Sequence, residues 1–255
     1  MSNESNHLAS IYAAATRLGY RLQKTVSAYA VADHLPAGLP PELKTLWIVC
    51  NTGDQVQVRW LGERDPRDLM AANRRAGPES AGPLDDFCRS ELVALLGNIP
   101  HAVLFPSTRS EPLFLLMPVL RAAGLLRPSP IMNSLHHHYG SWWAVRAVIA
   151  LQTQATSNRS DELGESPCLQ CDAPCADACP GGAVNRVGWD FDACARQRLR
   201  VNSSCADCCP ARLACPAGAA FQYDDRVLRY HYDTSRESLE AFVAEAPQVT
   251  RRYET

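Results

Sequence analysis

Hydrophobic and polar positions along the first 150 residues follow helical and strand-like periods in turn. Leu8, Ile11 and Ala15 recur at helical spacing and Gly19 follows, which predicts an amphipathic helix over residues 5–18. Short apolar or alternating runs between Pro- and Gly-rich loops predict strands instead. Strands are expected at 21–32, 46–50, 56–60 and 101–105, and further helices at 66–75, 84–96 and 111–124.

The last apolar run of this part, residues 142–153, fits either a strand or a helix, because periodicity alone does not separate the two. A polar stretch with hardly any apolar residue follows at 153–166 and predicts a linker. The sequence therefore divides into an α+β body at 1–155, a cysteine-rich module at 156–220 and a C-terminal tail at 221–255.

Composition and charge narrow the class of protein. Of the 255 residues, 46% are hydrophobic, which is enough for a core in the body. The formal net charge of −2 lacks the basic excess that binds a phosphate backbone, so nucleic acid is not an expected partner. The N-terminus is polar, and no apolar run approaches the roughly 20 residues of a membrane span. We therefore expect a cytoplasmic protein without membrane association.

Nine of the eleven cysteines gather in one short part of the chain. Without an export signal, clustered cysteines are better interpreted as thiolate ligands than as disulfides. The first motif reads C-x2-C-x3-C-x3-C-P, one residue longer in the middle than the bacterial ferredoxin pattern, and the second motif also ends in Cys-Pro. The nine are Cys168, Cys171, Cys175, Cys179, Cys194, Cys205, Cys208, Cys209 and Cys215.

This spacing is typical of two interlocked [4Fe–4S] clusters. Closely spaced thiolates surround three corners of one cube, while the cysteine before proline reaches the other cube. One member of the adjacent pair Cys208 and Cys209 is then spare. We expect one cluster on Cys168, Cys171, Cys175 and Cys215, and the other on Cys179, Cys194, Cys205 and either Cys208 or Cys209.

Structural zinc is the main alternative, since it also uses paired C-x2-C sites. Zinc needs only four ligands per site and does not call for two Cys-Pro endings, so clusters are preferred. The two remaining cysteines, Cys50 and Cys88, lie in the body, where buried and unreactive thiols are expected.

A second unusual segment, HHHYGSWWAVRAVIA at 136–150, precedes the cysteine module. It resembles the segment before the cluster motif of the epoxyqueuosine reductases, and a similar segment occurs in the cobalamin-processing decyanase/dealkylase chaperones. In the reductases a comparable cysteine module follows, with an isolated cysteine ahead of the second C-x2-C, as Cys194 stands here ahead of Cys205. The resemblance covers roughly residues 100–220.

The resemblance implies a nitroreductase-like α/β body followed by a bacterial-ferredoxin-like module with two [4Fe–4S] clusters, an arrangement that reductive dehalogenases share. It implies an oxidoreductase whose clusters pass electrons to a corrinoid (cobalamin), for reductive chemistry or cobalamin processing. The implied partners are a low-potential donor protein of the ferredoxin or flavodoxin type and a small-molecule or corrinoid substrate. The corrinoid would contact His136, Tyr139, Gly140, Ser141, Trp142 and Arg146.

Two other functions stay open from the sequence. The chain lacks the Asp-Thr-Gly-Pro segment that carries the reductases' general acid, which favours a two-cluster electron carrier without a substrate of its own. A flavin-dependent reductase is the other, because FMN requires neither a G-x-G-x-x-G nor a P-loop. No catalytic acid is assigned: Asp85, Asp86 and Glu111 fit helix starts, and His136, His137 and His138 fit a polar loop.

Overall fold

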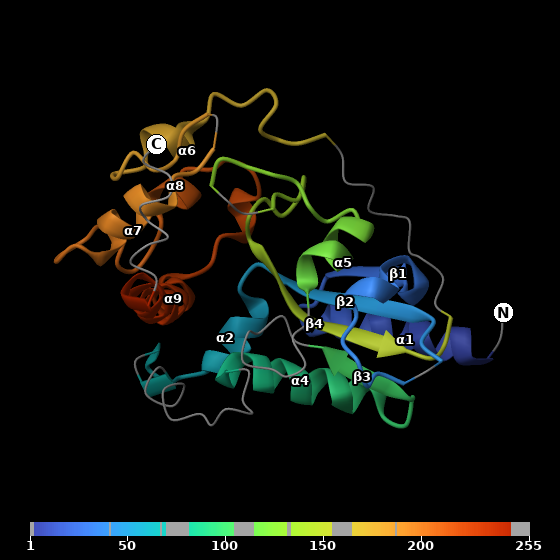
Figure 1. Ribbon diagram of the computed structural model, residues 1–255. Helices are drawn as coiled ribbons and strands as arrows, with labels where there is room; N and C mark the ends of the chain where they lie inside the picture. Colours follow the sequence, from blue (N-terminus) through green and yellow to red (C-terminus); the bar gives the residue numbers. More distant parts are fainter. Residues whose placement is uncertain are drawn as a thin grey trace. The chain divides into compact units, whose positions relative to one another are not determined.

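The computed structural model describes residues 3–40, 42–66, 68–69, 82–104, 115–131, 134–154, 165–186 and 188–245 (Figure 1). Contacts within the chain divide it into two compact units, and each is described by itself. The first unit comprises Met1–Gly62, Ala71–Leu126 and Trp142–Gly164, and the second comprises Glu63–Met70, Arg127–Ser141 and Glu165–Thr255.

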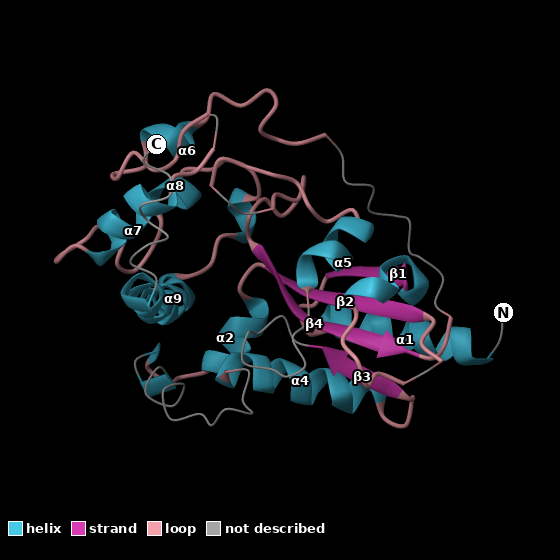
Figure 2. Ribbon diagram, in the orientation of Figure 1, coloured by secondary structure: helices cyan, strands magenta, loops and turns pink. Residues whose placement is uncertain are grey.

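A four-stranded antiparallel sheet forms the centre of the first unit (Figure 2). Its strands are β1 (Leu22–Ser27), β2 (Thr45–Thr52), β3 (His101–Leu104) and β4 (Trp143–Leu151). They lie in the order β1-β2-β4-β3, so β2 and β4 occupy the middle. Every residue of β2 and the last six of β4 are buried, which explains why both strands are continuous apolar runs in the sequence.

Helices cover this sheet within the first unit. They are α1 (Asn3–Arg17), a 3-10 helix (Ala28–His34), α2 (Gln55–Leu61), α4 (Pro83–Leu96) and α5 (Leu116–Ala122). Helix α4 packs against α1 and β4, and α5 packs against the 3-10 helix. The buried residues of α4 recur every four positions, as expected for one helix face turned to a core: Leu84, Cys88, Leu92 and Leu96.

The strand predicted at 56–60 is wrong, because these residues lie in helix α2. Alternation of Val56, Val58 and Trp60 favoured a strand, but the same residues also fit a four-residue helical spacing. In the structure Val56, Trp60 and Leu61 are buried on one side, while 39% of Val58 is exposed. The helical period therefore decides which side chains reach the core.

Other predicted elements of this unit keep their type and change their limits. The strand predicted over 21–32 ends at Ser27, where the 3-10 helix begins. The ambiguous run at 142–153 is the strand β4. Most of the helix predicted at 66–75 lies outside the described residues, as do residues 111–114 of the helix predicted at 111–124.

The second unit consists of short helices and loops around the cysteine segments. Its helices are α6 (Pro174–Asp177), α7 (Phe191–Leu199), α8 (Pro210–Leu213), a 3-10 helix (Ala219–Phe221) and α9 (Asp225–Glu245). Helix α6 packs against α8, and α7 packs against α9. Among the helices described in either unit, none has the length and apolar character needed to cross a membrane.

The core of the second unit combines small apolar side chains with cysteines. Ile131 and Leu135 come from the segment before the sheet strand β4, and they join the same buried cluster as Cys175 and Cys215. Five of the cysteines belong to this cluster or pack against it. The unit is therefore of the kind that bound metal usually stabilises.

The predicted boundary at 155/156 falls within residues 155–164, which lie outside the described residues. The structure adds that Arg127–Ser141 packs with the cysteine-rich segments, although these residues precede the linker in sequence. The overall class is α+β, as predicted, with a small antiparallel sheet and a larger helical content.

Candidate functional site

Two short helices, α6 and α8, position cysteines at the start of a turn. Each begins with a proline, Pro174 in α6 and Pro210 in α8. Proline suits this first position, because its fixed φ matches the helix and no N–H is needed there. The sequence thereby places Cys175 inside the single turn of α6 and Cys209 at the N-cap of α8.

Cys168, Cys171, Cys175 and Cys215 line one cavity of about 1150 Å³. Burial raises the pKa of the Cys215 thiol, and the nearby Cys175, Cys168 and Cys171 raise this pKa further. Such an effect requires proximity, because each negative charge opposes the formation of another only over short distances. These four thiols therefore form one group, named the first thiol group below.

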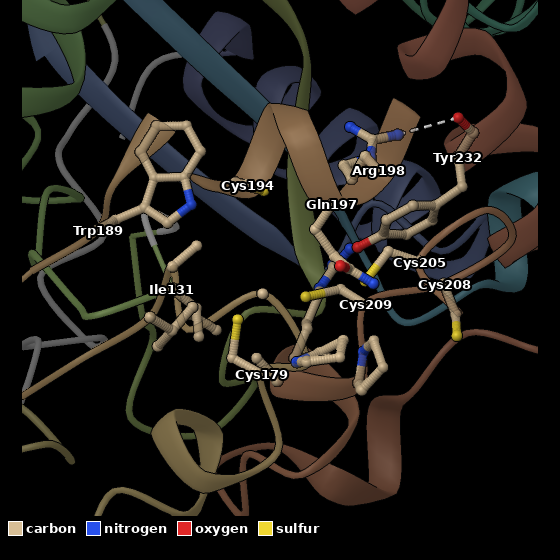
Figure 3. Close-up of a pocket in the computed structure, with 17 residues that line it drawn as sticks. Ile131, Cys179, Trp189, Cys194, Gln197, Arg198, Cys205, Cys208, Cys209 and Tyr232 are labelled. Carbon is tan, nitrogen blue, oxygen red and sulfur yellow. Dashed lines mark hydrogen bonds between the residues drawn. The ribbon is translucent and has the colours of Figure 1, made fainter. Parts of the chain in front are cut away.

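Cys179, Cys194, Cys205, Cys208 and Cys209 line a second cavity, of about 220 Å³ (Figure 3). Burial raises the pKa of the Cys205 thiol, and Cys209, Cys194 and Cys179 raise it further. Cys179, Cys194 and Cys205 thus share a cavity with both members of the Cys208 and Cys209 pair. Cys209 is counted with the first three for the reason given below, and these four are named the second thiol group.

Helix α7 carries Cys194 into the second thiol group. Its N-cap is Asp190, whose Oδ1 accepts a hydrogen bond at 2.9 Å from the backbone N–H three residues on. A methyl group added at Gly181 would meet Cβ of Gln197, on α7, at 2.7 Å. Because Gly181 follows Cys179 by two residues, this close approach brings Cys179 to the helix that carries Cys194.

The geometry distinguishes Cys209 from its neighbour Cys208. Cys208 also lines this cavity, but in Figure 3 the sulfur of Cys209 points toward Cys179, whereas that of Cys208 is turned away from the other sulfurs. The Cys208 thiol lies 3.9 Å from the carbonyl oxygen of Ser204, to which it donates. Burial raises the pKa of Cys208, and Cys209 and Asp207 raise it further. Cys209 is therefore the better candidate for the fourth ligand.

Polar and aromatic side chains complete the lining of the second cavity. Burial raises the pKa of the Cys194 thiol, while a hydrogen bond with the Trp189 side chain lowers it. The Arg198 guanidinium lies 5.1 Å from the centre of the Tyr232 ring. Arg212 lines the same cavity from α8. This surrounding is more cationic than that of the first cavity, where Arg186 is the arginine in the lining.

All eleven cysteines are free thiols. Cys50 and Cys88 are fully buried in the first unit, as expected, and burial raises the pKa of both thiols. Among the described residues, no three Cys, His, Asp or Glu side chains are arranged closely enough to hold one metal ion directly.

The Tyr139–Gly140 turn packs directly on the backbone that follows Cys215. Gly140 (φ 56°) and Gly218 (φ 70°) both have left-handed backbones. A methyl group at Gly140 would overlap the carbonyl of Ala217, and one at Gly218 would overlap the carbonyl of Tyr139. Two predicted corrinoid contacts, Tyr139 and Gly140, therefore lie beside the segment that carries a thiol of the first group.

His136 organises this turn from a buried position. Only 3% of its surface is exposed, and its Nδ1 accepts hydrogen bonds from the backbone N–H groups of His138 and Tyr139 at 3.1 and 3.3 Å. Its own backbone pairs with that of Gly140. The rings of His138 and Tyr139 each pack against Phe221, with centroids 4.9 Å apart. His136 thus supports the turn, whereas His138 is exposed, as expected for a polar loop.

Ser141 is held by an arginine of the second unit. Arg212 donates from Nε to Ser141 Oγ at 3.1 Å and from Nη2 to the Ser141 carbonyl at 2.6 Å. The same guanidinium lies 5.1 Å from the centre of the Tyr223 ring. His136, Tyr139, Gly140 and Ser141 thus belong together in one compact unit.

Trp142 and Arg146 belong to the first unit and lie in its interior. Trp142 is fully buried, and its carbonyl accepts a hydrogen bond from Gly53 N at 2.7 Å. Arg146, on β4, donates from Nε to Asn51 Oδ1 at 2.7 Å and forms an ion pair with Asp85 at 3.5 Å. These contacts give both residues a role inside the sheet, and their contact with a corrinoid stays a prediction.

Two carboxylates that were candidates for a catalytic acid lie at the start of a helix, as expected. Asp85 and Asp86 lie in the first turn of α4. Burial raises the pKa of the Asp85 carboxyl, and the Arg146 guanidinium opposes this rise. Glu111 lies outside the described residues. The structure thus gives Asp85 an internal partner and assigns no catalytic acid.

Sequence reasoning did not find several residues that surround the second thiol group. Trp189, Arg212 and Tyr232 stand between or after the cysteine motifs, and no spacing rule connects them to a ligand. Arg198 is different, because it follows Cys194 by four residues, which places both on one face of a helix.

The chain is similar to known proteins in structure and not in sequence. No model of a known protein family matches the chain, and no curated protein matches it. Epoxyqueuosine reductase from Bacillus subtilis superposes with a TM-score of 0.47 at 12% identity, over 86% of this chain and 67% of that one. The enzyme from Streptococcus thermophilus gives a TM-score of 0.45 at 9% identity, over 98% of this chain and 86% of that one.

A second similar structure is that of a protein of cobalamin trafficking. The B12-trafficking protein CblC from C. elegans, a homologue of human MMACHC, gives a TM-score of 0.46 at 14% identity, over 92% of this chain and 95% of that one. Both groups are those that the resemblance of the sequence named. The comparison records this likeness and assigns no activity to the chain.

Proposed function

We propose that this chain is an iron–sulfur electron-transfer protein whose second unit holds two [4Fe–4S] clusters, one on each thiol group. The observation that carries the proposal is that the four thiols of the first group line one cavity, while the four of the second group, together with Cys208, line another. Each group also draws members from both cysteine motifs, since Cys215 joins the first motif's thiols and Cys179 joins the second's. This exchange of the Cys-Pro cysteine is typical of two-cluster ferredoxins.

The residues present fit such clusters chemically. Thiolates are the ligands that iron–sulfur clusters use, and four of them are available in each group. Burial raises the pKa of several of these thiols, so protons must leave as the metal binds. The chain contributes the dry shell of Ile131, Leu135 and Trp189, which limits the access of water. When bound, the clusters supply one-electron transfer.

Metal and sulfide analysis tests this proposal. The protein is purified and reconstituted without oxygen, and iron, acid-labile sulfide and zinc are measured per chain. We expect about eight irons and about eight sulfides, with the EPR signal of reduced cubane clusters after dithionite. About two zinc ions without sulfide would instead support the structural zinc alternative.

We further propose that electrons pass from these clusters to a corrinoid, in a reductase that uses or processes cobalamin. The support is the resemblance at 136–150 together with the packing of the Tyr139–Gly140 turn on the segment after Cys215. A low-potential ferredoxin or flavodoxin would supply the electrons. When bound, a corrinoid supplies cobalt-centred reductive chemistry, and the protein supplies placement and electrostatics.

One observation favours the simpler alternative, an electron carrier without a substrate. Arg146 and Trp142, two of the predicted corrinoid contacts, are engaged in internal contacts of the first unit. A carrier would need neither residue for binding. The carrier and the reductase therefore differ in whether the loaded protein binds a corrinoid.

Titration with cob(II)alamin separates these functions. The cluster-loaded protein is titrated without oxygen while UV-visible and EPR spectra are followed. Stoichiometric uptake with a base-off signal supports the corrinoid reductase. An unchanged cobalamin spectrum beside intact cluster signals contradicts it and leaves the carrier or an FMN-dependent reductase, which flavin content distinguishes.

A further inference from the structure

The arginines at the end of helix α7 differ in their surroundings. Arg196 and Arg200 are exposed, whereas Arg198 lines the second cavity. Arg198 follows Cys194 by one helical turn, so both side chains lie on the same face of α7. Figure 3 shows Arg198, Cys194 and Tyr232 on the same side of this cavity.

Helix α9 holds the Arg198 side chain in place. Nη2 of Arg198 donates to the Tyr232 carbonyl at 3.1 Å and to Ser235 Oγ at 2.9 Å, and the guanidinium stacks over the Tyr232 ring. Arg236, also on α9, donates to the Arg198 carbonyl at 3.0 Å. A cation fixed at both its side chain and its backbone exerts a constant field on the thiol group beside it.

The Nε–H of Arg198 is buried and has no acceptor among the described residues. A buried donor without an acceptor is unfavourable unless a ligand supplies one. Thiolate and sulfide sulfur atoms of a bound cluster are acceptors of this kind. The orphaned donor and the fixed charge thus belong to a residue that lines the cavity of the second thiol group and whose charge acts on Cys194.

The first thiol group lacks a matching feature among its described neighbours. Arg186, the arginine that lines its cavity, is exposed and donates to the backbone carbonyls of Cys171 and Asp172. Its charge is therefore screened by water. The two groups offer different electrostatic surroundings to otherwise similar clusters.

We propose that Arg198 raises the reduction potential of the cluster on Cys179, Cys194, Cys205 and Cys209 above that of its partner, so that this cluster accepts the first electron. This inference rests on the proposed function. Reduction adds one electron, and so one negative charge, to a cluster that is already anionic with its thiolates. A nearby cation and an N–H donor stabilise the reduced form more than the oxidised form.

A potentiometric EPR titration with dithionite tests this inference on the cluster-loaded protein. In Arg198→Gln, which removes both charge and Nε–H, the potential of one cluster should fall by about 59 mV, a tenfold change in a one-electron equilibrium. Arg198→Lys keeps the charge and loses the Nε donor, so a smaller fall is expected. Arg196→Gln, which removes an exposed charge from the same helix, should leave both potentials unchanged.

The signals are assigned with Cys175→Ala, which removes a ligand of the first thiol group only. The inference is overturned if neither Arg198 variant shifts a potential more than Arg196→Gln does, or if both clusters shift equally. Iron and sulfide content are measured on every variant, and Arg198→Lys carries the test if Arg198→Gln fails to load. Wild-type protein without clusters would overturn the proposed function itself, a result that these titrations distinguish from failure of the Arg198 inference.

Discussion

Adjacent cysteines have different roles here because of the backbone that joins them. Cys209 has an extended conformation (φ −115°, ψ 107°) just before α8 begins. Successive side chains on extended backbone point in opposite directions, which fits the divergent sulfurs of Cys208 and Cys209. The spacing predicts that one of the pair is spare, and the backbone at the start of α8 favours Cys209 as the ligand.

Substitution of each cysteine in turn tests this assignment. Cys209→Ser should lose about half of the bound iron, because one cluster lacks its fourth thiolate. Cys208→Ser should retain iron and sulfide close to the wild-type content, since its sulfur is turned away from the other sulfurs and donates to the Ser204 carbonyl. Iron, sulfide and EPR measurements on both variants check this. Equal losses in the two variants, or a loss confined to Cys208→Ser, would contradict the assignment.

Arg146 shows how an unusual residue can be structural. The resemblance of the segment 136–150 made it a candidate for contact with a corrinoid. The partners are Asn51 on the neighbouring strand and Asp85 on α4, both far away in sequence. No local pattern predicts such a pair, since it depends on the order of strands and on the helix packed against them.

Arg146→Met should lower the free energy of unfolding by about 2–4 kcal/mol at neutral pH, since a partly buried carboxylate and an amide lose their partner. The loss should depend on pH. Burial already raises the pKa of Asp85 above its ordinary 3.8, and removal of the opposing guanidinium raises it further. An acid whose pKa is raised by folding costs stability above that pKa, and the cost disappears as pH falls through it.

Urea denaturation followed by tryptophan fluorescence, at several values between about pH 5 and about pH 8, measures this dependence. The difference between wild type and Arg146→Met should shrink toward the acidic end. The double variant Arg146→Met/Asp85→Asn serves as control, because it has no carboxyl to titrate at this place. A difference that is constant over the whole range would show that Asp85 does not sense Arg146.

At the scale of elements, the sequence predicts long, strongly patterned segments well. Helices α1 and α4 and the central strands β2 and β4 follow from apolar spacing or from unbroken apolar runs. Helix α2 does not, because in a segment of seven residues an alternating pattern and a helical pattern share the same apolar positions. Burial against β2 and α4 decides between them, and burial is a property of the fold.

The contact between the Tyr139–Gly140 turn and Gly218 is another feature that the sequence does not connect. Each glycine alone suggests a turn. That both positions must be glycine becomes clear only from the structure, where the two backbones touch and leave no room for a side chain at either position. This contact fixes the segment that follows Cys215, and so it contributes to the position of a thiol of the first group.

Alanine at Gly140 or Gly218 should therefore destabilise the second unit strongly. The expected loss is about 3 kcal/mol or more, because a left-handed backbone and a backbone overlap both oppose the methyl group. Gly182→Ala is the matched control: Gly182 has φ 60° in the same unit but open space around its Cβ position, so about 1–2 kcal/mol is expected. Thermal unfolding and iron content are measured for these variants and for the control. Similar losses at Gly140 and Gly182 would show that the backbones do not touch.

At the scale of the whole molecule, the two units differ in what holds them together. The first has a core of complete strands and helix faces. In the second, cysteines occupy positions that large apolar residues would fill in an ordinary core. Cysteine spacing predicted which thiols would share a cavity, with Cys208 and Cys209 both in the second, because closely spaced ligands and the Cys-Pro exchange are local properties. The participation of Arg127–Ser141 was not predictable, since Ile131 and Leu135 resemble any apolar loop residues.

Removal of the metal should consequently affect the units unequally. If the proposed clusters are present, their removal takes the common partner from eight thiols that belong to or surround the core of the second unit, so we expect this unit to lose most of its stability. The first unit keeps the hydrogen bonds of the sheet and a core such as Trp47, Ile48 and Ile149. Hydrogen exchange on protein treated with chelator and oxidant should show fast exchange in α6 to α8 and continued protection in β2 and β4. Equal loss of protection in both units would mean that the sheet depends on the clusters, and continued protection of both would mean that the cysteine unit folds without metal.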